Sequence, residues 1–145
     1  MKIKRAIFIL IMMVLTMQLF AGDFEDQVRE LVKESSPDIY NRMKVRAIDE
    51  WKDDHEMILY TITEQCNSFF YVLQGISSEN ITIIVNSILD WSYDQETLAK
   101  NLDLMNLEID REKGTFSADW ILELDVDWTM MAYTLKQQIE AREKY

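Results

Sequence analysis

The fold is decided by residues 40–73, which read YNRMKVRAIDEWKDDHEMILYTITEQCNSFFYVL. Apolar side chains recur along this stretch at steps of three and four, with occasional adjacent pairs, which is the period of an α-helix. The spacing predicts helix, with room for a break at Lys52-Asp53-Asp54. The residues of the stripe, with one histidine at its edge, are Tyr40, Met43, Ala47, Ile48, Trp51, His55, Ile58, Leu59, Ile62, Cys66, Phe69, Phe70 and Leu73.

The competing interpretation is a pair of strands, because residues 57–63 and 69–73 are rich in β-branched and aromatic side chains. As strands, both segments would mix apolar and polar side chains on each face. If the segment is a helix, all the polar residues from Thr61 to Ser68 lie outside the apolar stripe. Helix is therefore the favoured prediction for 57–73.

Two further helices are predicted next to this stretch. The first covers residues 23–34, which place their apolar side chains on one side. It is followed by Ser35-Ser36-Pro37-Asp38, a typical start for the helix that carries the stripe from Tyr40. Serine caps a helix, proline suits the first helical position and aspartate favours the positive end of the helix dipole. Gly75 supplies a stop. Ser77-Ser78 is then expected to cap a helix that reaches Trp91.

The pattern changes to period two in the last third of the chain. Met105, Leu107 and Ile109 alternate with polar residues, and the same alternation runs from Phe116 to Val126. Period two predicts strands with one buried face. A loop ending in Gly114 would set Ile109 opposite Phe116, and a shift by one residue would bury carboxylates. Helical spacing returns from Trp128 to Ile139.

The predicted fold class is therefore α+β: a helix-rich single domain with one antiparallel β-hairpin, about 105–110 and 115–127, packed on helices. A lone hairpin is marginal in water, so its apolar face should lie on the helical layer. The stretch Leu122 to Val126 would have no partner strand within the hairpin. Such an edge is either covered, paired with a strand that the pattern does not reveal, or available to bind another chain.

Residues 1–22 have the pattern of a secretory signal peptide. Lys2, Lys4 and Arg5 precede an apolar run, and the small pair Ala21-Gly22 stands before the first acidic residue. Thr16 and Gln18 interrupt the run before it reaches the length of a membrane span. We expect an exported protein, periplasmic or secreted, with residues 23–145 as one acidic globular domain. The alternative is an uncleaved signal that tethers the domain to a membrane.

The mature region is strongly acidic. Residues 23–145 hold twelve Lys and Arg against all 26 Asp and Glu, a formal net charge of −14. Such a chain has no electrostatic attraction to nucleic acid or to an anionic membrane surface. Cations or basic proteins are the partners that charge favours, although solubility alone also accounts for the acidity. With Cys66 as its only cysteine, the chain has no intrachain disulfide, and that thiol is expected to be buried and inert.

Four residues are weak candidates for a site. His55 lies beside carboxylates but has no second histidine to complete a zinc motif. Glu123, Asp125 and Asp127 share the polar face of the predicted second strand, where side chains about 6.6 Å apart do not converge on a metal ion. The sequence thus assigns no catalytic residue, no cofactor and no metal site.

The favoured function is a non-enzymatic, protein-binding or envelope-associated module that binds another protein by its unpaired strand edge or by an aromatic-lined helical groove. The alternative is a cation-binding protein or a carboxylate-dependent hydrolase in the periplasm. It would use the three strand carboxylates, or His55 with its neighbours.

Overall fold

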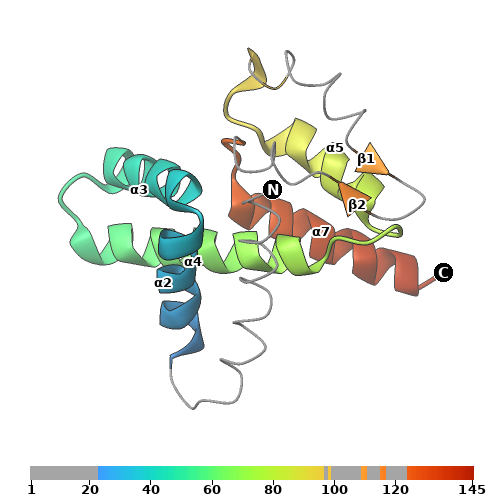
Figure 1. Cartoon of the computed structure of the whole chain (residues 1–145), viewed down its shortest axis with the longest axis horizontal. Helices are drawn as coiled ribbons and strands as arrows, with labels where there is room; N and C mark the ends of the chain where they lie inside the picture. Colours follow the sequence, from blue (N-terminus) through green and yellow to red (C-terminus); the bar gives the residue numbers. More distant parts are fainter. Residues whose placement is uncertain (1–22, 97, 99–108, 111–114, 117–123) are drawn as a thin grey trace.

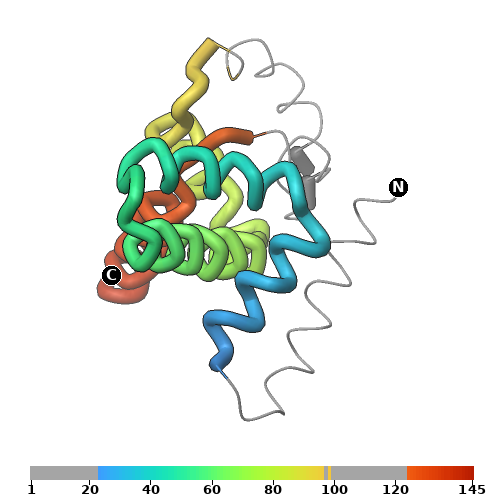
Figure 2. Tube along the Cα trace, turned by 90° about the vertical axis from the view of Figure 1, so that its left-hand side faces the viewer, coloured from blue at the N-terminus to red at the C-terminus, as the bar shows by residue number. Residues whose placement is uncertain are grey.

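Helix α4, His55–Gln74, is the centre of the fold, and three other helices pack against it. The computed structural model describes residues 23–96, 98, 109–110, 115–116 and 124–145. Helix α3, Pro37–Trp51, lies along the first half of α4, and α7, Trp128–Glu143, lies along its second half, while α2, Phe24–Ser35, crosses it (Figure 1). The turned view in Figure 2 shows α3 and α4 side by side as a helical hairpin. Helix α5, Ile81–Trp91, packs on α7.

The long apolar stripe of residues 40–73 forms two helices. The break falls at Lys52-Asp53-Asp54, where Lys52 has a positive φ of 52° and Asp54 caps α4 by accepting a hydrogen bond from the Met57 amide at 3.1 Å. Pro37 stands at the start of α3, as expected. Residues 57–73 are helical, which confirms the favoured interpretation over the pair of strands.

The core lies where α4 meets its neighbours. Phe69 of α4 and Trp128 at the start of α7 are both buried, and their rings pack edge to face with centroids 4.7 Å apart. Gly75 ends α4, and a Cβ built on it would lie 2.8 Å from Cδ2 of Leu135, so glycine lets α7 approach closely here. Helical spacing from Trp128 onward is confirmed, because its apolar stripe faces α4 with Trp128, Met131 and Leu135 buried.

The predicted α+β class is wrong for the residues that the structure describes. Their fold is a bundle of helices, and their β-structure consists of two residue pairs, β1 (Ile109–Asp110) with β2 (Thr115–Phe116), and one isolated bridge. Ile109 lies opposite Phe116 in this short ladder, but two pairs do not make the hairpin layer expected over 105–110 and 115–127. Residues 99–108 and 117–123, on which most of that hairpin was predicted, lie outside the described residues.

The end of the predicted second strand, for which no partner was expected within the hairpin, pairs with the segment just after α5. Val126 forms an antiparallel bridge with Ser92, the Tyr93 amide donates to the Asp125 carbonyl at 2.8 Å, and the Asp127 amide donates to the Trp91 carbonyl at 3.0 Å. Alternation does indicate an extended backbone here, but its partner is the chain just after α5. The described part of the Leu122–Val126 edge is therefore paired, and it is not an open binding edge.

The start of α5 also differs from its prediction. The helix begins at Ile81 with Asn80 as the capping residue, and the Ser77 carbonyl accepts hydrogen bonds from the amides of Asn80 and Ile81 in the preceding turn. The Oγ of Ser77 also accepts from the Asn80 amide at 3.3 Å, so Ser77 shapes this turn, while Asn80 takes the capping position of the helix.

The predicted export signal, residues 1–22, lies outside the described part of the chain. Within the part that is described, no helix combines the length and the apolar character that a membrane crossing needs.

Candidate functional site

A small polar pocket of about 80 Å³ lies between the α3–α4 hairpin and the segment that leads into α7. Apolar core residues form its floor, and its polar side chains come from three places. Helix α3 contributes Arg42, Arg46 and Glu50, α4 contributes Thr61 and Gln65, and the paired segments contribute Tyr93, Asp125 and Asp127. The pocket therefore joins segments that are far apart in the sequence.

Arg46 binds two of its neighbours in this pocket. Its Nε donates to Oδ1 of Asp125 at 2.9 Å, and its Nη2 donates to Oδ2 of the same carboxylate. The face of the guanidinium lies over the Tyr93 ring, 3.6 Å from the centroid. The hydrogen bond with Asp125 raises the pKa of Arg46, so this cation stays charged throughout the working range of pH. Two-pronged binding and ring stacking are the geometry in which arginine is most specific.

The carboxylates of Asp127 and Asp125 both act on the phenol of Tyr93. Burial raises the pKa of its phenol to about 12, and the neighbouring Asp127 carboxylate adds to this rise. Because both causes oppose the phenolate, Tyr93 stays protonated at any ordinary pH. It therefore acts here as an aromatic platform and a hydrogen-bonding hydroxyl.

Asp127 is a structural cap. Its Oδ1 accepts hydrogen bonds from the Met130 amide at 3.1 Å and from Nε2 of Gln65 at 3.0 Å. The Oε1 of Gln65 in turn accepts from the Trp128 amide at 2.9 Å. These bonds fix the first turn of α7 to the middle of α4.

The four site residues proposed from sequence are not all in one place. Asp125 and Asp127 do come together in one pocket, but they face Arg46 and Gln65 and are not the solvated strand face that was predicted. His55 is exposed at the start of α4 and does not line this pocket. Glu123 lies outside the described residues. Among those that are described, no three His, Cys, Asp or Glu side chains are placed to hold a metal ion.

Cys66 is buried in the α3–α4 interface, with its Sγ 3.6 Å from Sδ of Met43. Burial raises the pKa of its thiol to about 12. Because the thiolate is the reactive form, this thiol is inert in the folded protein.

The two arginines of α3 were not among the candidates predicted from sequence. Arg42 donates to the Leu124 carbonyl at 3.1 Å, so both arginines bind the same segment. Their spacing of four residues places them on one face of α3, which is the signal that could have revealed them.

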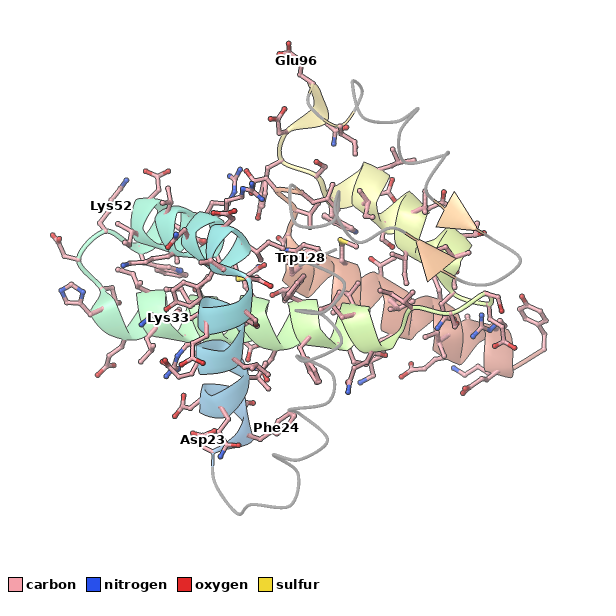
Figure 3. The ribbon with its side chains drawn as sticks, viewed as in Figure 1. Asp23, Phe24, Lys33, Lys52, Glu96 and Trp128 are labelled. Carbon is pink, nitrogen blue, oxygen red and sulfur yellow. The ribbon has the colours of Figure 1, made fainter. Side chains whose placement is uncertain are left out.

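A second feature lies at the outer end of the α3–α4 hairpin. An open hollow there is lined by Val45, Ile48, Asp49, Lys52 and Asp53, and Leu59 and Tyr60 follow in the first turns of α4. We call these seven residues the hairpin-tip surface. Figure 3 shows Lys52 at this end of the hairpin, well away from Trp128 at the centre of the fold.

The apolar residues of this surface are unusually exposed for their type. The exposed fraction is 66% for Val45, 43% for Ile48, 50% for Leu59 and 60% for Tyr60. At a rise of about 1.5 Å per residue, each lies within roughly 10 Å of the turn along its helix. Val45 and Ile48 line one hollow together with three charged residues, while Leu59 and Tyr60 lie at the same end of the hairpin on the second helix. Exposed apolar side chains that line a common hollow are typical of an interaction surface, whereas single scattered ones are not.

Comparison with protein-family models, with curated proteins and with solved structures finds no match to this chain, so the assignment of a function depends on the geometry described above.

Proposed function

We propose that this chain is a small acidic protein, exported to the periplasm or beyond the cell, that acts by binding another protein through the hairpin-tip surface. The export part of the proposal is supported by residues 1–22, with their basic start, apolar run and small closing pair. An envelope association follows if that segment is retained as an anchor.

The observation that carries the binding proposal is the exposure of Val45, Ile48, Leu59 and Tyr60. The same two helices pack a buried apolar face, on which Met43, Ala47, Ile62 and Cys66 are nearly inaccessible. The exposed set is therefore not the result of a poorly packed hairpin. Exposed apolar surface next to polar residues is what a partner protein covers.

The polar pocket supports a structural role. A general acid or base needs a proton-accepting group within reach of a substrate. Arg46 holds the Asp125 carboxylate with two bonds, and Asp127 accepts from Gln65 and the Met130 amide. Because the two candidate carboxylates are engaged in this way, the geometry favours binding over hydrolysis or cation capture.

Site-specific photo-crosslinking tests the proposal. A photoreactive phenylalanine derivative replaces Tyr60 in one variant and Tyr133 in another, because both are tyrosines of similar exposure, 60% and 57%, on different helices. In the producing cell we expect a discrete adduct from position 60 that is lost in the double variant Val45→Ser/Ile48→Ser. No adduct at position 60, or the same adducts from both positions, would contradict the proposal.

A further inference from the structure

We infer that the hairpin-tip surface takes a basic amphipathic segment of its partner, in which Lys or Arg side chains flank apolar ones. This inference rests on the proposed function and adds the chemistry of the partner. Its basis is the combination, at one end of the hairpin, of exposed apolar side chains and an excess of carboxylates.

The carboxylates are concentrated in the turn itself. Residues 49–56 read DEWKDDHE, with five carboxylates against Lys52 as the one cation when His55 is neutral, a formal charge of −4. The Nζ of Lys52 binds Oδ1 of Asp49 at 3.0 Å, so these two charges offset each other and the formal charge of −4 belongs to Glu50, Asp53, Asp54 and Glu56. Asp53 and Glu56 are both exposed.

The helix dipoles add to this field. The carbonyl end of α3 lies at the tip, and its last turn holds no basic side chain to neutralise the partial negative charge there. The opposite, positive end of α4 begins beside it but is capped by Asp54 and carries Glu56 in its first turn. The potential at the tip therefore favours cations on both sides of the turn.

The apolar side chains decide what kind of cation binds. A metal ion would gain nothing from contact with Val45 and Ile48. A protein segment that carries both kinds of side chain gains from the apolar contact and from the charge, which is how acidic apolar grooves bind basic amphipathic helices. Arg and Lys side chains also cover apolar surface with their methylene stems while keeping their charges in water.

The same charge argues against three other occupants. Two copies of this chain that met through this surface would place two tips of formal charge −4 against each other, and like charges in contact oppose association. An anionic membrane and a nucleic acid would be repelled for the same reason. A basic protein segment is the occupant that the surface selects.

The direct test uses protein produced from the full-length gene and an 18-residue peptide of leucine and lysine arranged as an amphipathic helix. One control peptide replaces each lysine with glutamate, and a second has the same composition with its leucines scattered around the helix. We expect the lysine peptide to bind in calorimetry, the glutamate peptide not to bind, and the scattered peptide to bind at least about tenfold more weakly.

Paired protein variants locate the binding. Val45→Ser/Ile48→Ser should lower the affinity for the lysine peptide by about tenfold or more, and Asp53→Asn/Glu56→Gln should lower it by about threefold to tenfold. The matched control Glu140→Gln/Glu143→Gln removes the same charge from exposed positions of α7 and should change binding by less than about twofold. All these positions are exposed, and an unchanged melting temperature shows that each variant is folded.

Three outcomes would overturn the inference. If Asp53→Asn/Glu56→Gln and Glu140→Gln/Glu143→Gln lower the affinity equally, the lysine peptide is attracted by the overall charge of the protein and not by the hairpin tip. Equal binding of the scattered peptide would mean that no apolar face is recognised. A dimer in sedimentation that Val45→Ser/Ile48→Ser dissociates would identify a second copy as the occupant.

The inference and the proposed function fail in different ways. If the position-60 adduct forms but excess lysine peptide does not compete with it, the partner binds by another chemistry and the inference is wrong while the function stands. If the peptide binds as expected but no adduct forms in the cell, the proposed function is wrong.

Discussion

Arg46 on α3 binds both oxygens of the Asp125 carboxylate, although the two residues are 79 positions apart in the sequence. This contact holds the α3–α4 hairpin to the segment that leads into α7. It is a two-pronged ion pair, and the Tyr93 ring restrains the guanidinium from one face. The pair is partly exposed, so its contribution to stability is expected to be modest.

Replacing Arg46 with alanine should lower the free energy of unfolding by about 1–2 kcal/mol, since it removes a two-pronged pair and a stacked ring contact. Arg46→Lys should restore less than half of the loss, because an ammonium cannot bind both oxygens in plane. Urea unfolding measures both values. The control Lys52→Ala removes an exposed pair with Asp49 and should cost less than about 0.5 kcal/mol. A loss in Arg46→Ala no larger than this control would show that the pocket contact carries no weight.

Helices were predictable because each buries one stripe at a 3.6-residue period, and the stripe of residues 40–73 needed only a turn at Lys52 to become α3 and α4. The segment 124–127 was not predictable in the same way. Its alternation does describe an extended chain with Val126 inward, but period two does not specify which segment pairs with it. Ser92 does, from the far end of α5.

The pocket was harder to predict from the sequence than the helices were. A charged residue on the polar face of a helix is predicted to be exposed to solvent. No local sequence pattern shows that Arg46 will bind Asp125. Asp127 was a candidate because of its carboxylate, yet its role depends on Gln65 of α4 and on the first turn of α7. Such roles are set by tertiary contacts, which the linear pattern does not contain.

The raised pKa of Tyr93 predicts a specific loss of stability in alkali. The folded value is about 12, mainly because of burial, and the ordinary value is 10. A group with a raised folded pKa gives its full stabilisation below the unfolded pKa and loses it as pH rises toward the folded pKa, here between about pH 10 and 12. Since Tyr93 is nearly half exposed, the loss should be on the order of 1 kcal/mol or less. Urea unfolding of wild type and Tyr93→Phe should converge over this range, and parallel curves would contradict the assignment.

Gly75→Ala should destabilise the protein by about 1 kcal/mol, because the new Cβ would lie 2.8 Å from Cδ2 of Leu135 and the side chain must shift. The same substitution should cost less in a Leu135→Ala background, since the clash is then absent. Thermal or urea unfolding of the four proteins gives this coupling energy directly. Additive effects would show that α7 does not approach Gly75 as closely as described.

Cys66 should resist thiol reagents until the protein unfolds. Its raised pKa of about 12, against an ordinary 9, leaves about a thousandfold less thiolate at pH 8, and burial blocks access as well. Labelling with a chromogenic disulfide should therefore be slow in buffer and fast in urea, with a rate in buffer that follows the opening of the α3–α4 interface. Labelling in buffer at the rate of an exposed thiol would contradict the buried position.

Lys52→Gly should stabilise the protein by about 0.5–1 kcal/mol. Lys52 has φ 52° and ψ −99°, a conformation that a residue with a Cβ adopts at a cost and glycine adopts freely. The substitution also removes the exposed bond to Asp49, but that loss is small. Lys52→Ala is the matched control, because it removes the same ammonium while keeping the Cβ, and it should give no gain. If glycine and alanine have equal effects in urea unfolding, the turn is not strained, and the α3–α4 hairpin ends in a different backbone geometry from the one described.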